Sequence, residues 1–273
     1  MGNLRDIAGR TVCITGASSG IGKAIAEHLG GLGAHVFLAG RSEGPMAESA
    51  ETIRNSGGQA DVAVFDVADT PALQSWIAGA AEATGRLDVM VNNAGFGDMG
   101  SIIDGDPDTW KTMLDVNVLA LAVGCQAAVR AMRATESEGN IINISSTATL
   151  RRDSGVYGAT KYAVNCINGT LREELQDDPI RVTAIKPGVF ATNFTRNVPR
   201  EMVEQMAGAA GVTDLDFDDE GKLPQHQIDA VQRALTPILG DVERIAETVA
   251  FVVSQPIEVN IEELVIRPQK SMF

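Results

Sequence analysis

The sequence predicts an α/β fold of the doubly wound, Rossmann-like kind, in which helices cover both faces of a parallel sheet. Short apolar runs alternate along the chain with longer segments whose apolar residues recur at helical spacing. The apolar runs are nearly continuous, as is typical of strands buried on both faces. A glycine-rich turn follows the first run and opens the first helical segment. Together these features predict repeated βαβ units.

Each predicted element follows from its local pattern. The predicted strands cover 11–15, 34–40, 60–67, 87–95, 140–145, 181–188 and 259–267. The predicted helices cover 21–33, 47–58, 70–85, 106–134, 155–177 and 241–254. Only the segment at about 189–240 breaks the alternation, and a long excursion from a compact sheet is typical of a lid or binding segment. No linker rich in Pro, Gly or Ser divides the chain, so we predict one domain over 1–273.

Charge and composition exclude several functions. The net charge of −14 disfavours binding to nucleic acid or to anionic membranes. The first ten residues contain no hydrophobic signal region, and no uninterrupted apolar run approaches 18 residues. We therefore expect a cytoplasmic protein with no membrane segment. The three cysteines and three histidines match no metal-ligand spacing, so no metal is expected.

The motif TGASSGIG, at 15–22, predicts a nucleotide site. Glycines at this position let the backbone approach a pyrophosphate, and the free N–H groups and dipole of the following helix attract its charge. The alternative, a turn that only packs helix on strand, remains open. The later motif NNAG, at 92–95, ends the fourth predicted strand at the same edge, where it makes a cofactor contact or simply a turn.

Arg41 and Ser42 favour NADP(H) over NAD(H). They follow the second predicted strand, where NAD-preferring folds usually carry an acid for the ribose 2′-hydroxyl. A guanidinium can instead bind a 2′-phosphate in a bidentate manner. Arg41 as a plain surface charge is the alternative. At the end of the third predicted strand, Asp66 is placed to accept a bond from the adenine amino group and Val67 to pack near the ring, or Asp66 caps the next helix.

Tyr157 and Lys161 share one face of a predicted helix because they are four positions apart. A free tyrosine has a pKa of about 10 and is a poor acid–base catalyst at neutral pH. A neighbouring cation favours the phenolate, so we expect Lys161, together with a cationic nicotinamide, to lower the Tyr157 pKa toward neutrality. The spacing alone is weak evidence, since it is common in ordinary helix packing.

Taken with the other motifs, the sequence resembles the short-chain dehydrogenase/reductase family in its classical form. The resemblance rests on TGASSGIG, NNAG, Asn117 in LDVNVLA, the serines of NISS, YGATK at 157–161 and KPGVFAT at 186–192. These motifs occur in the family's order and extend over 10–267. The resemblance implies a Rossmann fold and an NADP(H)- or NAD(H)-dependent oxidoreductase that interconverts a hydroxyl and a carbonyl group on a small molecule.

The resemblance also implies a role for each matching residue. Tyr157 would give or take the hydroxyl proton, and Lys161 would hold the nicotinamide ribose. Ser146 would hydrogen-bond the substrate oxygen, and Asn117 would support a proton-relaying water. From the resemblance and from the strand-end positions given above, the residues predicted along the cofactor are Gly16, Ser18, Ser19, Gly20, Ile21, Gly22, Arg41, Ser42, Asp66, Val67, Asn93, Ala94, Gly95, Tyr157, Lys161, Pro187, Gly188, Val189 and Thr192.

One departure from the family pattern concerns the catalytic serine. Ser146 precedes Tyr157 by eleven positions, about two fewer than is usual, which leaves Ser145 as an alternative. We choose Ser146 because alternation along the strand turns the two serines to opposite sides, and the family usually uses the later one. Ser18 and Ser19 are a second departure, since some NADP-preferring relatives have a basic residue there.

The substrate is open. Arg151, Arg152, Arg196 and Arg200 near one crevice would suit an anionic substrate, whereas Phe190, Phe194, Met202 and Met206 would suit an apolar one. The family resemblance implies a homodimer or homotetramer formed through the helices predicted at 106–134 and 155–177. The alternative function is a catalytically silent nucleotide-binding sensor or scaffold of the same fold.

Overall fold

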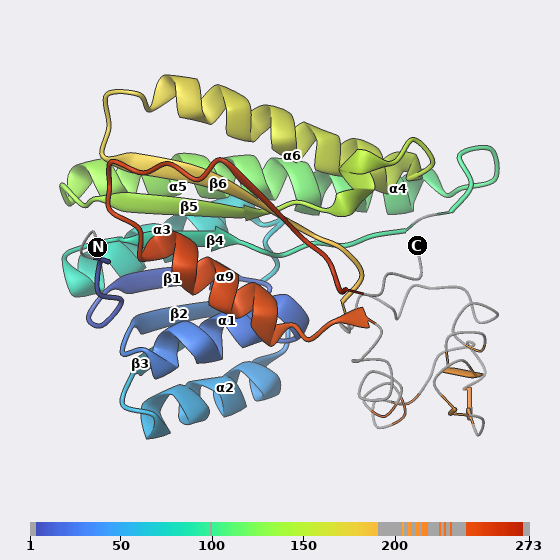
Figure 1. Ribbon diagram of the computed structural model, residues 1–273, viewed down its shortest axis with the longest axis horizontal. Helices are drawn as coiled ribbons and strands as arrows, with labels where there is room; N and C mark the ends of the chain where they lie inside the picture. The colour runs from blue at the N-terminus through green and yellow to red at the C-terminus, as the bar shows by residue number, and fades with distance from the viewer. Residues whose placement is uncertain are drawn as a thin grey trace.

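The computed structural model describes residues 4–98, 100–190 and 239–269, and between them positions 204, 207, 208, 211, 212, 215–217, 224, 227 and 230. Within these residues, seven parallel strands form one sheet in the order β3-β2-β1-β4-β5-β6-β7 (Figure 1). The strands are β1 (Thr11–Thr15), β2 (His35–Gly40), β3 (Gln59–Val64), β4 (Val89–Asn92), β5 (Gly139–Ile144), β6 (Ile180–Pro187) and β7 (Glu263–Ile266). The predicted fold class is confirmed.

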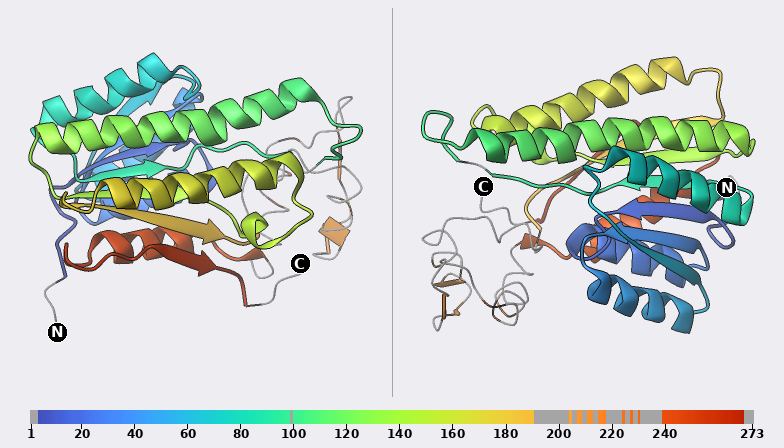
Figure 2. Two further views of the ribbon diagram at one scale, coloured as in Figure 1. Left: turned by 90° about the horizontal axis from the view of Figure 1, so that it is seen from above. Right: turned by 180° about the vertical axis from the view of Figure 1, so that it is seen from behind.

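Helices cover both faces of this sheet. One layer contains α1 (Gly20–Gly31), α2 (Glu43–Asn55) and α9 (Glu243–Val253). The other contains α3 (Thr70–Thr84), α5 (Leu121–Ala134) and α6 (Gly155–Glu174) (Figure 2). Strand β1 supplies both cores, since Val12 and Ile14 pack in the first and Cys13 in the second. This alternation explains why the strand sequence is apolar throughout.

Several boundaries differ from the predictions. Helix α2 begins at Glu43 rather than at 47, because Ser42 is the extended residue before it and Pro45 is accepted in its first turn. Strand β3 ends at Val64, so Asp66 lies beyond it and not at its end. The Asp66 carboxylate accepts a hydrogen bond from the Ala68 N–H at 3.0 Å and forms a turn of its own. Asp69 caps α3 through the Ala72 N–H.

The helix predicted over 106–134 is continuous but not uniform. It consists of α4 (Pro107–Leu114), the π-helical segment η1 (Asp115–Ala120) and α5. Among the described residues, this 28-residue run is the one helix long and apolar enough, by length and composition, to cross a membrane. The count of uninterrupted apolar residues does not find this run, because its window contains isolated polar residues. Half of that window is buried inside the protein, as in a core helix.

The free cysteines do not all behave as packed apolar residues. Cys13 and Cys125 are buried, but Cys166 is exposed on α6. Most of the excursion at 189–240 lies outside the described residues, so the structure gives no account of it as a lid. Among the residues it does describe there, Phe190 is buried.

Candidate active site

The candidate site lies at the carboxyl edge of the sheet. Strands β1 and β4 are neighbours there, and the chain runs outward from them in opposite directions, to β2 and β3 on one side and to β5 and β6 on the other. In doubly wound sheets, ligands bind outside the carboxyl ends of the strands at such a switch point. The sequence motifs TGASSGIG, NNAG and NISS follow β1, β4 and β5, so the topology brings all three to this edge.

The glycine-rich turn after β1 has the geometry that its sequence requires. Gly16 and Gly20 have φ angles of 66° and 56°, in the left-handed region that favours glycine. Ser19 is the extended residue before α1, and its side chain makes no capping hydrogen bond. Within the described residues, the first-turn N–H groups of α1 therefore have no acceptor from the N-cap side chain, which leaves them suited to an anionic group.

Asn93 holds this turn in place. Its side-chain amide donates to the carbonyl oxygens of Thr15 at 2.9 Å and of Gly16 at 3.2 Å. A Cβ on Gly22 would collide with the same amide and with the Gly16 carbonyl. The Thr15 hydroxyl in turn accepts bonds from the N–H groups of Asn93 and Ala94, both at 3.1 Å. These hydrogen bonds hold the NNAG turn against the glycine-rich turn. The sequence analysis did not predict this structural role for Thr15 and Asn93.

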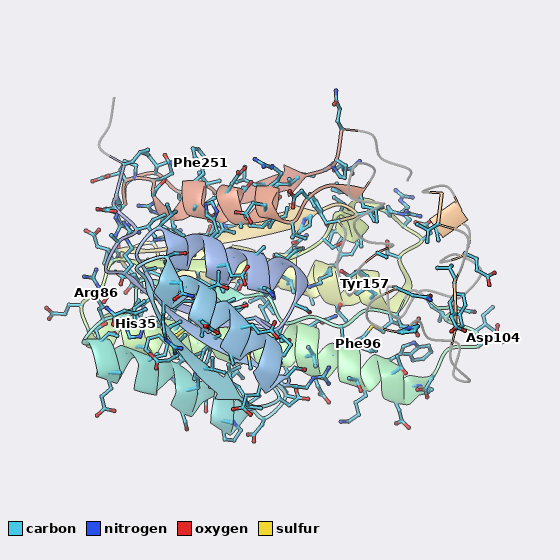
Figure 3. The ribbon with its side chains drawn as sticks, turned by 90° about the horizontal axis from the view of Figure 1, so that it is seen from below. His35, Arg86, Phe96, Asp104, Tyr157 and Phe251 are labelled. Carbon is cyan, nitrogen blue, oxygen red and sulfur yellow. The ribbon has the colours of Figure 1, made fainter. Side chains whose placement is uncertain are left out.

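Tyr157 is buried in the first turn of α6. It packs with Met113 and Ala148, and with the half-buried Phe96, which lies close to it in Figure 3. Burial raises the pKa of Tyr157 to about 12, although a hydrogen bond with the Ser146 side chain acts to lower it. The chain without cofactor therefore raises this pKa, and the lowering expected from Lys161 together with a cationic nicotinamide stays a prediction. The desolvation of the phenol outweighs its polar contacts.

Lys161 lies one turn further along α6 and is also buried. Its ammonium donates to the Ile144 carbonyl at 2.8 Å and lies 5.9 Å from the centre of the Tyr157 ring. A Cβ placed on Gly95 would lie 3.6 Å from Lys161 Nζ, so the NNAG turn borders the ammonium. Burial lowers the pKa of Lys161 to about 8.

The two serines after β5 point to different partners. The Ser145 hydroxyl donates to the Asn165 side chain of α6 at 2.8 Å. Ser146 bonds with Tyr157 and accepts the Ala148 N–H at 3.0 Å, where it caps the short helix η2 (Thr147–Leu150). The structure thus brings Ser146, and not Ser145, to the tyrosine hydroxyl.

Asn117 lies in the π-helical segment η1, a distortion that often marks functional sites. Its side-chain oxygen accepts from the Phe96 N–H at 2.9 Å, and its amide donates to the Phe96 carbonyl at 2.7 Å. The amide also donates to the Thr160 hydroxyl at 3.0 Å. Asn117 therefore connects the segment after β4 to α6 between Tyr157 and Lys161.

The predicted adenosine end is open to solvent. The Arg41 side chain is 80% exposed, and its guanidinium lies 3.8 Å from the Asp66 carboxylate. Ser42 is exposed beside it, and its side chain makes no capping bond to α2. Val67 is buried in the core with Phe37 and Leu73. Arg41 and Ser42 are thus available to a ligand. The Asp66 carboxylate already accepts the Ala68 N–H and lies near the Arg41 guanidinium.

The predicted nicotinamide end is described only in part. Gly188 continues from β6 and donates its N–H to the Ile266 carbonyl at 2.7 Å. Pro187 is buried, and Val189 is 36% exposed. Thr192 lies outside the described residues. The remaining members of the cofactor set, Ser18 and Ile21, are half-buried at the glycine-rich turn.

Only two of the four arginines considered for an anionic substrate, Arg151 and Arg152, lie in the described residues. Arg151 makes two bonds to Asp153, at 2.8 and 2.9 Å, on an exposed loop. Arg152 is exposed. Residues Arg196, Arg200, Phe194, Met202 and Met206 lie outside the described residues. The neighbouring Asp153 therefore satisfies Arg151 locally, which weakens the case for an anionic substrate.

A family model for short chain dehydrogenases matches residues 10–203. The match covers more than half of the chain, so this protein belongs to the short-chain dehydrogenase family of oxidoreductases. The chain is 31% identical over 266 residues to an uncharacterized oxidoreductase of Staphylococcus saprophyticus subsp. saprophyticus, covering 96% of this chain and 99% of the relative.

Two further relatives carry more specific descriptions. Glucose 1-dehydrogenase 2 of Bacillus subtilis is 35% identical over 205 residues, which cover 74% of this chain and 80% of that enzyme. A metagenomic short-chain oxidoreductase, solved in complex with NADP, superposes with a TM-score of 0.74 at 28% identity. That comparison covers 97% of this chain and 99% of the other.

Proposed function

We propose that this protein is an NADP(H)-dependent oxidoreductase that interconverts a hydroxyl and a carbonyl group on a small molecule. The observation that carries the proposal is the contact of the buried Tyr157 with Ser146, with the Lys161 ammonium 5.9 Å from the tyrosine ring. An acid–base hydroxyl, a second hydroxyl and an ammonium at the edge of a nucleotide-binding sheet suit chemistry at a C–O bond.

The described residues fit a nicotinamide dinucleotide. The uncapped first turn of α1 and the positive φ angles of Gly16 and Gly20 suit a pyrophosphate. The exposed Arg41 and Ser42 suit a 2′-phosphate, which supports the preference for NADP(H). In this proposal Asp66 and Asn93 would lie near the adenosine, and Lys161, bordered by Gly95, would hold the nicotinamide ribose. When bound, the nicotinamide would supply or accept the hydride.

The protein's own residues handle the proton and the oxygen. In the reducing direction, Tyr157 gives its hydroxyl proton to the carbonyl oxygen, while the Ser146 hydroxyl donates a hydrogen bond to that oxygen. In the oxidising direction, Tyr157 takes the proton back. Because burial holds the pKa of Tyr157 near 12, useful catalysis at neutral pH requires positive charge beside the phenol. Lys161 supplies one such charge, and we propose that the oxidised nicotinamide supplies the other.

Asn117 has two parts in this proposal. Its side chain holds Phe96 and Thr160, and so aligns the segment after β4 with the catalytic face of α6. We also propose that it supports a water that relays protons from Lys161 to solvent.

The proposal also covers the localisation, the binding partners and the assembly of the enzyme. We propose a single cytoplasmic domain that binds neither nucleic acid nor membrane and assembles as a homodimer or homotetramer. Exposed apolar side chains on the helices named for assembly, Leu114, Leu119 and Tyr162, support a pairing surface there. The acidic net charge of −14 supports the exclusion of nucleic acid.

The test is turnover of NADPH and NADH with a panel of aldehydes, ketones and alcohols that contains acidic, neutral and sugar members. Reduced nicotinamide is followed by its absorbance. We expect turnover of a neutral carbonyl or hydroxyl compound, faster with the NADP(H) pair. Tight cofactor binding without turnover of any member would favour the silent sensor and count against the enzyme.

A further inference from the structure

The carboxyl end of β5 contacts α6 through four consecutive residues. Asn143 donates to the Asn168 side chain at 2.5 Å, and the Ile144 carbonyl accepts from Lys161 at 2.8 Å. Ser145 donates to Asn165 at 2.8 Å, and Ser146 bonds with Tyr157. Two of these contacts belong to the catalytic residues. The other two, Asn143 with Asn168 and Ser145 with Asn165, are not explained by the proposed mechanism.

The α6 partners form one stripe along the helix. Lys161 and Asn165 follow Tyr157 at successive intervals of four, and Asn168 is three further on, so all four residues point toward β5. Asn168 is fully buried, and Asn143 also accepts from the Asn92 side chain of β4 at 2.8 Å. A chain of amides therefore ties β4, β5 and α6 together below the catalytic contact.

Ser145 directly follows β5 and is still hydrogen-bonded to the neighbouring strand. Its N–H donates to the Ile185 carbonyl of β6 at 2.7 Å, while its hydroxyl reaches Asn165. Ser146 follows immediately and caps the short helix η2. The position of Ser146 therefore depends on how Ser145 is fixed, and the position of Lys161 depends on how Asn165 fixes the next turn of α6.

We propose that Asn165 is a positioning residue: through its hydrogen bond to Ser145, it sets the register of α6 on β5 in which Tyr157 meets Ser146 and Lys161 reaches the Ile144 carbonyl. Asn143 and Asn168 form a second contact of the same kind. The inference rests on the proposed function for its catalytic consequence, but not for its structural one. Loss of the Asn165 oxygen leaves the buried Ser145 hydroxyl without its acceptor, so the strand end and the helix can shift.

The test uses the full-length protein and a readout that needs no substrate. Lysine labelled with ¹³C at Cε gives the Lys161 pKa by NMR titration, with the signal assigned by its absence in Lys161→Met. In Asn165→Ala, water reaches the ammonium and the Lys161 pKa rises by about one unit or more from its value of about 8. With a substrate from the panel, kcat falls about tenfold and KM stays within about twofold, because misplacement affects the reacting groups.

Four further variants make the result specific. Ser145→Ala should reproduce Asn165→Ala, and the double variant should be no worse than either, since both remove one contact. Ser145→Thr keeps the hydroxyl and should restore the Lys161 pKa. Asn140→Ala is the control, because Asn140 is a buried asparagine of β5 whose amide nitrogen makes no hydrogen bond in the described structure. It should leave the pKa and kcat unchanged.

The outcomes are distinguishable. If Asn165→Ala and Ser145→Ala lower thermal stability but leave the Lys161 pKa and kcat at wild-type values, the contact is only structural and the proposal is rejected. If Asn165→Ala does not fold, the smaller change Ser145→Ala decides. If the wild-type protein turns over no substrate, the proposed function fails, while the NMR titration still decides whether Asn165 positions Lys161.

Discussion

The Lys161 ammonium and the Tyr157 ring are held 5.9 Å apart, and both groups are buried in the same face of α6. Burial acts on the two groups in opposite directions, since it raises the pKa of Tyr157 to about 12 and lowers that of Lys161 to about 8. In each case the neutral form is favoured. A charged group that enters the site would therefore change the pKa of both side chains.

Removal of the Tyr157 hydroxyl tests the acid–base role. Tyr157→Phe keeps the ring packed against Phe96 and Met113, so we expect it to fold and to bind cofactor within about threefold of wild type. Turnover should fall by at least about 100-fold, the usual range for loss of a general acid–base group. Steady-state kinetics and cofactor titration check both expectations. Tyr162→Phe, which changes the exposed second tyrosine of the chain, should have no effect. Undiminished turnover in Tyr157→Phe would remove this residue from the mechanism.

The burial of Lys161 predicts a pH-dependent stability. Because its folded pKa is depressed from 10.5 to about 8, the folded state binds this proton less well than the unfolded state. The stabilising contribution is present above pH 10.5 and is lost as the pH falls through 8. The total change is about 3 kcal/mol, at about 1.4 kcal/mol per pKa unit.

Lys161→Met lacks this titration. Its stability relative to wild type should therefore improve as the pH is lowered from about 10.5 to about 7.5. Denaturant unfolding at several pH values in this window measures the difference. Lys111→Met, at an exposed lysine paired with Asp115, is the control and should show no such rise. A flat difference for Lys161→Met would contradict the burial of a depressed ammonium.

The different partners of Ser145 and Ser146 predict different losses. Ser146→Ala removes the hydroxyl beside Tyr157 and should lower kcat by about 100-fold or more. Ser145→Ala removes only the bond to Asn165 and should lower kcat by about tenfold. The two variants should be compared in parallel with one substrate. A larger loss at Ser145 would reverse the assignment of the catalytic serine.

Charge reversal at Arg41 tests the cofactor preference. Arg41→Asp removes the guanidinium and places a carboxylate near Asp66, so it should shift the ratio of NADP to NAD affinities toward NAD by about 10- to 100-fold. Isothermal titration with both cofactors gives this ratio. Arg130→Asp, a matched reversal at an exposed arginine of α5, should leave it unchanged. If the ratio does not move in Arg41→Asp, Arg41 makes no contact with a 2′-phosphate.

The sequence by itself determined the order of the elements and the residues that meet at the carboxyl edge. Apolar periodicity identifies strands and helices because burial requires it, and the glycines of TGASSGIG identify the turn before α1. The position of Tyr157 and Lys161 on one helix face follows from four-residue spacing alone. These are local properties, and each can be read from a short segment.

Only the tertiary structure decided the burial, the pKa and the hydrogen-bond partners of these residues. The raised pKa of Tyr157 in the chain without cofactor depends on burial by distant segments, which the four-residue spacing to Lys161 does not indicate. Likewise, the pairing of Ser145 with Asn165, the lock between Asn93 and the Gly16 turn and the bond between Arg151 and Asp153 are side-chain contacts. Alternation suggested that the two serines diverge, but the partner of each is set by helix α6 packing on β5, which no local pattern specifies.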